Sequence, residues 1–174
     1  MSEVLNQQKG NGGSGQMLAS IATIARESVA SMNDIVWAIS PDYDRLIDLT
    51  RRMRQHAEEL FTIRDIDLVF VTDTSDSNLR LTAGTRRDVL LIFKEAVSNA
   101  ARHSGCTKVE VELQQKGTHL TLSIRDDGRG FDSGGAFDGH GLRSMARRAE
   151  TLGGVLEIDS GSGRGTLVSL KMPL

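Results

Sequence analysis

The sequence is poor in the residues that build disulfide-rich, fibrous or membrane-spanning proteins. Its 174 residues include one cysteine, two prolines and only 4% aromatic residues. The single cysteine, Cys106, cannot form an internal disulfide, which suits a reducing compartment. No apolar run reaches the roughly 18 residues that a membrane-spanning helix needs. The N-terminus also lacks the basic-then-apolar pattern of a signal peptide. We therefore expect a cytoplasmic location and no membrane segment in this chain.

An excess of charge of one sign is also missing. The chain carries 21 basic and 23 acidic residues, a formal net charge of −2, so net charge gives no reason to expect a nucleic-acid partner. Hydrophobic residues make up 39% and charged residues 25%, the ordinary mixture of a globular protein. Glycine is plentiful instead, with 18 residues. Many of them fall in the last third of the chain.

The pattern divides the chain into a helical region, 1–40, and a larger domain, 41–174. Residues 10–15 are mostly glycine and indicate a loop or linker. From Met17 to Ile39 the apolar residues recur at alternating spacings of three and four, which predicts an amphipathic helix. This stripe fits a coiled-coil-like dimerisation helix, or an ordinary helix that packs on its own domain. Pro41 ends it.

The larger domain reads as an α+β sandwich, with a mixed, mainly antiparallel sheet and helices on one face. Predicted helices cover residues 46–62, 86–103 and 141–152. Alternating apolar residues predict strands at 66–71, 109–113, 120–124, 155–158 and 166–172. The residues 115–117 join the second and third strands as a hairpin turn.

One face of the helix 86–103 carries chemically active side chains. These are Glu95, Asn99, Arg102 and His103. Mg²⁺ prefers hard oxygen ligands and takes only one or two from protein when phosphates supply the rest. Asn99 and Glu95 can serve such a metal, and the two basic groups can meet phosphate. The same spacing occurs on ordinary solvated helix faces, so this helix alone decides nothing.

Three glycine-containing motifs follow. Asp126-Asp127-Gly128-Arg129-Gly130 comes directly after a strand; its first carboxylate suits a donor such as an adenine amine, although Asp-Gly is also a common turn pair. Gly139-His140-Gly141-Leu142 opens a helix, where free amides attract phosphate. Gly163-Arg164-Gly165-Thr166 leads into the last strand and offers a hydroxyl. Between the first two lies a glycine-rich segment with the composition of a nucleotide lid. No phosphate-binding P-loop motif and no protein-kinase motif occurs.

Together these motifs resemble the GHKL (Bergerat-fold) ATPase superfamily and, within it, the sensor histidine kinases of two-component systems. Residues 94–103 look like the N box, Asp126-x-Gly128-x-Gly130 like the first glycine box and Gly139-x-Gly141-Leu142 like the second. The short lid and the Gly-Leu-x-x-Met helix are most similar to those of the subgroup paired with helix-turn-helix response regulators. Residues 31–41 also resemble the second dimerisation helix of that subgroup.

The resemblance implies ATP and Mg²⁺ as cofactors and a role for each motif. Asp126 would recognise adenine, Asn99 and Glu95 would manage the metal, and Glu95 would assist phosphoryl transfer. The expected nucleotide-binding residues are Asn99, Arg102, His103, Asp126, Gly128, Gly130, Gly139, Gly141, Leu142 and Thr166.

The acceptor histidine of that family has no clear counterpart here. The four histidines are His56, His103, His119 and His140. His56 is followed by Ala57 instead of an acid, and we interpret it as a surface or domain-interface residue. We expect the chain to start just past the acceptor helix, to bind ATP and to phosphorylate a histidine outside itself.

The expected partners are the phosphoacceptor helix of the full-length kinase, a response regulator and a second copy of the chain. The expected location includes the cytoplasmic part of a membrane-bound sensor. An anti-sigma-type serine kinase and a non-enzymatic ATP-sensing module remain alternatives.

Overall fold

The structure is a computed structural model that describes residues 17–18, 20–22, 25, 29, 32–74, 79–131 and 139–174. The predicted loop at 10–15 lies outside these residues. The chain divides into two compact units, Met1–Ile39 and Ser40–Leu174. In the first unit the described residues between 17 and 39 are helical, as predicted, and many of their large apolar side chains are exposed. No described helix is long and apolar enough to cross a membrane.

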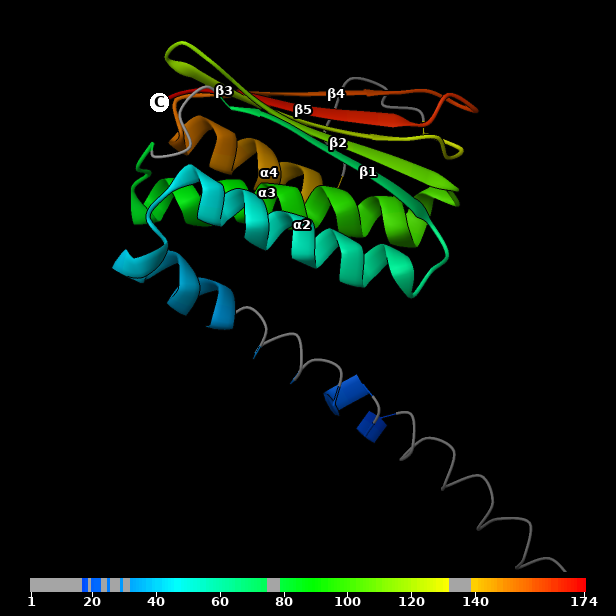
Figure 1. Cartoon of the computed structure of the whole chain (residues 1–174). Coiled ribbons are helices and arrows are strands. Elements are labelled where there is room, and N and C mark those ends of the chain that lie inside the picture. The colour runs from blue at the N-terminus through cyan, green and yellow to red at the C-terminus, as the bar shows by residue number, and fades with distance from the viewer. Residues whose placement is uncertain are drawn as a thin grey trace, which may run out of the picture. The chain divides into compact units, whose positions relative to one another are not determined.

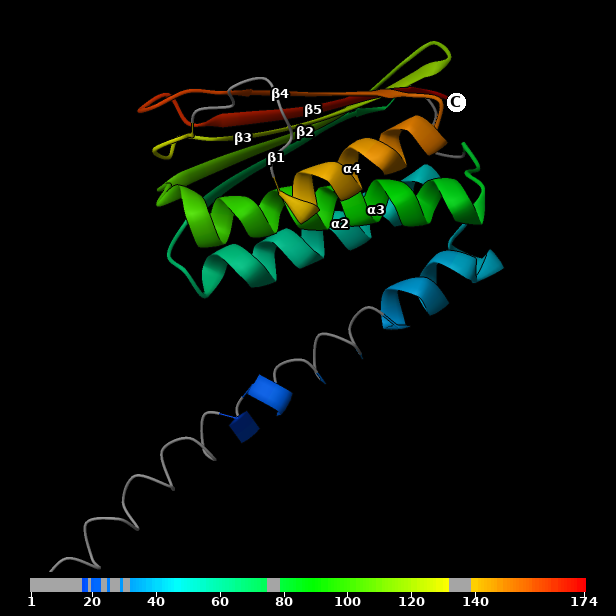
Figure 2. The same ribbon diagram turned by 180° about the vertical axis from the view of Figure 1, so that it is seen from behind.

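The second unit pairs one five-stranded sheet with three helices. A short 3-10 turn η1 (Pro41–Tyr43) precedes α2 (Leu46–Thr62), β1 (Asp67–Thr74) and α3 (Ala83–Asn99). A π-helical turn η2 (Ala100–Ser104), the hairpin β2 (Lys108–Lys116) and β3 (His119–Asp126), α4 (His140–Thr151), β4 (Val155–Ser160) and β5 (Thr166–Pro173) follow. The strand order is β1-β2-β3-β5-β4, and only β1 and β2 are parallel. All three helices cover the same face of the sheet (Figures 1 and 2). The predicted α+β sandwich is confirmed.

The core forms where the alternating strand residues meet the helix layer. The inward-facing residues of β2, β3 and β5 are at most 7% exposed; they are Val109, Val111, Leu113, Leu120, Leu122, Ile124, Val168, Leu170 and Met172. From α3, Phe93, Ala96 and Val97 pack into the same layer, at most 3% exposed. Burial of this apolar surface is the main contribution that holds the sheet against its helices.

The buried face of α2 ends on Phe61, which is 1% exposed, whereas its neighbour Leu60 is half-buried. Phe61 follows Ala57 by four residues, so it continues the buried stripe. His56 is also half-buried, and its ring meets the ring of Phe93 edge-on with 6.4 Å between centroids. His56 therefore packs against Phe93 of its own unit, and its interpretation as a surface or domain-interface residue stays a prediction.

The helix α3 differs from its prediction at both ends. It begins at Ala83, three residues early, because the Thr82 hydroxyl caps it by accepting the Thr85 N–H at 3.1 Å. At its other end the α-helix stops at Asn99 and widens into the π-helical turn η2. Such wider turns occur often at functional sites. Here η2 determines the positions of the side chains that follow Asn99.

Candidate functional site

A cavity of about 300 Å³ opens between α3 with η2, the start of α4, and the sheet. Residues from every predicted motif line it: Asn99, His103, Asp126, Gly130, Leu142 and Thr166. The remaining lining residues are Ala96, Ala100, Ser104, Ile124, Arg129, Phe131, Ile158 and Val168. Residues as far apart in the sequence as Ala96 and Val168 thus converge on one mainly apolar pocket with few polar groups. Such pockets are typical of small-molecule sites.

Asp126 is the buried acid of this cavity. It is 7% exposed, and its Oδ1 accepts the Gly128 N–H at 2.9 Å. Burial raises the pKa of Asp126, and hydrogen bonds from the Gly128 and Thr166 amides oppose that rise. The strand register explains the second amide, since Asp126 and Thr166 are directly paired between β3 and β5. The last strand therefore helps to hold the carboxylate.

Asp127, the next residue, has a different role. Its carboxylate accepts the Thr107 and Lys108 N–H groups at 2.8 and 2.9 Å and the Thr107 hydroxyl at 2.8 Å. These hydrogen bonds, chiefly the one from Lys108, lower the pKa of Asp127. Asp127 thus stabilises the start of β2 through these hydrogen bonds. No local pattern predicted this structural role for Asp127, because its partners lie about 20 residues away in the sequence.

Close approach requires glycine at several positions of the site, Gly128 and Gly141 among them. A Cβ on Gly128 would come within 2.5 Å of the Ser104 Cβ, so a side chain there would push η2 away. A Cβ on Gly141 would overlap the carboxylate of Glu95. Gly139 is different, because the nearest atom to its added Cβ would be the Leu142 Cγ at 4.0 Å. Glu95 therefore lies against the first turn of α4.

A serine that the sequence analysis missed ties two of the motifs together. The Ser160 hydroxyl accepts the Phe131 N–H at 2.9 Å and lies 3.0 Å from the Thr166 hydroxyl. It also donates to the Gly165 carbonyl at 3.2 Å. Ser160 is 8% exposed and ends β4, which brings it across from Thr166. No local signal marks it, because its function depends on two other segments, one with Phe131 and one with Gly165 and Thr166.

The structure does not bring every predicted site residue into the cavity wall. Arg102 is exposed, and neither Arg102 nor Glu95 is among the residues that line the cavity. Glu95 and Asn99 are one helical turn apart on α3, beside the start of α4. Among the described residues no group of three histidine, cysteine, aspartate or glutamate side chains forms a ready-made metal centre. A metal here would need most of its ligands from another molecule.

Comparison with known proteins decides what kind of fold encloses this cavity. Residues 84–174 match the family described as histidine kinase-, DNA gyrase B- and HSP90-like ATPase. The chain belongs to this ATPase family. ATP binding is implied by that membership. All four motif segments of the cavity lie inside the matched region of the ATPase.

Relatives of this ATPase include sensor kinases. It is 38% identical over 95 residues to the sensor histidine kinase LiaS of Bacillus subtilis, covering 54% of this chain and 26% of LiaS. It is 37% identical over 98 residues to the sensor protein VraS of Staphylococcus aureus, covering 56% of this chain and 28% of VraS. The matched segment is thus little more than a quarter of these relatives' length. The predicted relationship to sensor histidine kinases is confirmed.

Solved structures support the same fold. The histidine kinase domain of the Erythrobacter litoralis EL346 blue-light activated histidine kinase matches with a TM-score of 0.64 and 20% identity, over 91% of this chain and 84% of that one. The histidine kinase AdeS of Acinetobacter baumannii matches with a TM-score of 0.63 and 15% identity, over 91% and 82%. At this level of identity the similarity concerns the fold alone.

Proposed function

We propose that this ATPase is the catalytic part of a two-component sensor histidine kinase. It transfers the γ-phosphoryl group of Mg-ATP to a histidine outside this chain, for relay to a response regulator. The observation that carries the proposal is the convergence of Asn99, Asp126, Leu142 and Thr166 on one cavity. The sensor kinase relatives favour this function over a serine kinase or a sensing module.

Asp126 is the proposed adenine-recognition residue. A carboxylate only accepts hydrogen bonds, so it selects a donor such as the exocyclic amine of adenine. The Gly128 and Thr166 amides fix its orientation, and the apolar side chains of Ile124 and Val168 offer flat contact to a purine ring. Gly130 and Thr166 complete the base site in this proposal.

The phosphates would lie toward the start of α4. His103 lines the cavity, and Gly139 and Gly141 flank the N-terminus of α4, where backbone amides favour negative charge. Arg102 follows Asn99 on the same turn and would meet phosphate from the exposed side. Asn99 and Glu95 offer two oxygen donors, the small number that Mg²⁺ takes from protein when phosphates provide the others. Mg²⁺ would neutralise phosphate charge there.

Glu95 is the proposed catalytic residue, as a base or as the group that orients the incoming histidine. Its contact with Gly141 makes a precise test available. The variant Gly141→Ala would displace the Glu95 carboxylate, and we expect roughly ten- to a hundredfold slower phosphoryl transfer, since small misplacements are costly. Gly139→Ala adds a Cβ whose nearest neighbour is the Leu142 Cγ at 4.0 Å, an ordinary contact, and should slow transfer less. Equal losses in both variants would remove Glu95 from the proposed role.

The deciding experiment measures binding and transfer separately. Calorimetry with Mg²⁺ and a nonhydrolysable ATP analogue should give saturable heat that Asp126→Ala abolishes and Asn99→Ala weakens. Labelled ATP should then label a separately supplied protein that carries an acceptor histidine. The label should be acid-labile, because phosphohistidine hydrolyses in acid and phosphoserine does not. Absence of binding at millimolar nucleotide, or an acid-stable product, would contradict the proposal.

The partners and location follow from the same proposal. The chain would act on the phosphoacceptor helix of the full-length kinase and work in the cytoplasm, free or as the cytoplasmic part of a membrane-bound sensor. The sensor proteins among its relatives support this placement.

A further inference from the structure

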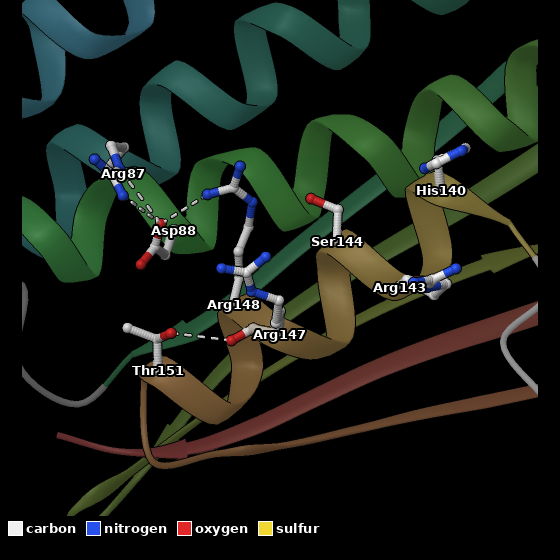
Figure 3. Close-up of a pocket in the computed structure, with 8 residues that line it drawn as sticks. All are labelled: Arg87, Asp88, His140, Arg143, Ser144, Arg147, Arg148 and Thr151. Atoms are coloured by element: carbon white, nitrogen blue, oxygen red, sulfur yellow. Dashed lines mark hydrogen bonds and ion pairs between the residues drawn. The ribbon is translucent and has the colours of Figure 1, made fainter.

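A second concave surface lies next to the nucleotide cavity, between α3 and α4. This groove has a volume of about 450 Å³ (Figure 3). Arg87 and Asp88 of α3 form one wall, and α4 contributes the other, with Arg143, Arg147 and Arg148 among its residues. Four arginines therefore share the groove with a single acid.

Asp88, the acid of this groove, already forms ion pairs with two of its arginines. The Asp88 side chain is 7% exposed, and its Oδ1 accepts hydrogen bonds from Arg148 at 3.0 Å and from Arg87 at 3.3 Å. Figure 3 shows both guanidinium groups directed at this carboxylate. In the part of the chain that the structure describes, no acid forms an ion pair with Arg143 or Arg147. Two exposed guanidinium groups in the groove are therefore available to an outside anion.

The layout of these charges fits an extended acidic segment better than a small anion. Arg143 and Arg147 are one helical turn apart on α4, so acids at i and i+4 of a partner helix match their spacing. From His140 to Thr151 the α4 wall of the groove runs for roughly 16 Å at 1.5 Å per residue. A single phosphate needs several donors that converge on one point, and here Arg87 and Arg148 converge on Asp88 instead.

We infer that this groove docks an acidic α-helical segment of a partner protein. The same helix α4 carries Leu142 into the nucleotide cavity, so a segment held along Arg143 and Arg147 lies beside the site of chemistry. Docking would thus place a phosphoryl acceptor close to the nucleotide; this consequence rests on the proposed function, whereas the docking itself does not. Charges at the rim of an interface mainly speed association and make it sensitive to salt.

The test uses the full chain and a designed peptide probe. The probe is a fluorescent helical peptide with glutamates at i and i+4 along one face, and its control carries glutamine at the same positions. Fluorescence anisotropy should show binding of the glutamate peptide alone, weakening as salt is added. The double variant Arg143→Glu/Arg147→Glu should weaken binding about tenfold or more, since it turns attraction into repulsion.

A matched variant separates the groove from overall charge. Lys116→Glu/Lys171→Glu makes the same change in net charge at exposed positions on β2 and β5, and it should keep peptide affinity within about twofold of the parent. Equal losses in both double variants, no binding of the glutamate peptide, or equally effective competition by inorganic pyrophosphate would overturn the inference.

Nucleotide calorimetry on the same samples keeps the two proposals apart. The groove variant should bind Mg²⁺ and the nonhydrolysable ATP analogue as the parent does. Loss of nucleotide binding in the groove variant alone would overturn the inference, because the groove would then belong to the nucleotide site. A parent chain that binds the peptide but no nucleotide would contradict the proposed function and leave the docking intact.

Discussion

Asp126 and Asp127 are neighbours in sequence, yet their surroundings shift their acidities in opposite directions. Burial raises the pKa of Asp126, whereas hydrogen bonds from backbone amides and from Thr107 lower the pKa of Asp127. A raised pKa means that ionisation of Asp126 lowers the stability of the folded chain, while the ionised group can accept a hydrogen bond from a ligand. A lowered pKa means that ionisation stabilises the fold. One residue is therefore suited to binding and the other to structure.

Asp126→Asn should weaken nucleotide binding more than it changes stability. The lost charge-assisted hydrogen bond corresponds to about 1.5–3 kcal/mol, or roughly tenfold or more in affinity. The amide oxygen still accepts one backbone N–H, and the burial cost of the charge disappears, so the free energy of unfolding should change little. Calorimetry and urea unfolding of the same samples measure the two quantities.

The same variant should change the pH dependence of binding. As pH falls through the raised pKa of Asp126, the wild-type carboxylate is protonated and affinity should decline earlier than for an ordinary carboxyl group. Between the unfolded and folded pKa values the folded chain binds more protons, so this group lowers stability as pH rises. Asp126→Asn should remove both trends. A wild-type affinity that stays flat into the acid range would exclude the ionised acceptor.

The variant Asp127→Ala tests the lowered pKa, the opposite shift to that of Asp126. Its folded pKa is lowered, so its contribution to stability is fully present above the unfolded pKa and is lost as pH falls through the folded value. We expect a loss of about 1 kcal/mol at neutral pH, kept small because the group is exposed. Urea unfolding at several pH values should show the difference from wild type shrinking in acid. Glu157→Ala, another exposed acid, controls for removal of one surface charge.

At the scale of elements, the turn between β4 and β5 lies against the backbone of Asp126, the proposed adenine-recognition residue. Gly163 and Gly165 both have positive φ, 75° and 70°. A Cβ on Gly163 would meet nothing within 4 Å, whereas one on Gly165 would overlap the backbone carbonyl of Asp126. A substitution at Gly163 would therefore cause backbone strain alone, whereas one at Gly165 would cause both backbone strain and steric overlap.

Gly165→Ala should destabilise the domain more than Gly163→Ala. The left-handed conformation alone costs roughly 1–2 kcal/mol in either variant. Overpacking against Asp126 should add about 1–3 kcal/mol to Gly165→Ala and should also weaken nucleotide binding. Thermal unfolding together with calorimetry measures both effects. Similar behaviour of the two variants would show that the turn does not press on the site.

The elements also show where prediction from the sequence succeeds. Periodicity located the helices and strands to within a few residues, and it also predicted the hairpin β2–β3, because these signals are local. The turn itself was wrong by two residues: Gln115 and Lys116 belong to β2, and Gly117 and Thr118 make the connection. The end of α3 was wrong, since a π-helical turn at Ala100–Ser104 has no periodic signature. Ser160 and Asp127 were missed because their partners arrive only through the sheet register. Long-range pairing, unlike local pattern, cannot be read from neighbouring residues.

At the scale of the whole molecule, the exposed apolar side chains among the described residues between 17 and 39 indicate an association surface. Ile21, Ile35 and Val36 are 55%, 45% and 62% exposed. An isolated short helix with such a face is marginal in water, and a second copy of the chain would cover it. This argument supports the expected homodimer and the proposed boundary between 1–40 and 41–174.

Sedimentation should therefore separate association from nucleotide binding. We expect the full chain to dimerise and the variant Ile21→Asp/Ile35→Asp to be monomeric. A fragment of residues 41–174 should also be monomeric, with nucleotide affinity within about twofold of the full chain because the cavity lies inside it. A dimeric fragment, or one that binds no nucleotide, would contradict the proposed division.

The position of β5 has a consequence during synthesis. This strand is made last of the five, yet it lies between β3 and β4, and its first residue supplies an amide to Asp126. A nascent chain still holding residues 166–173 inside the ribosome has an open seam in the sheet. We expect such a chain to bind no nucleotide, so prematurely terminated products should not compete for ATP.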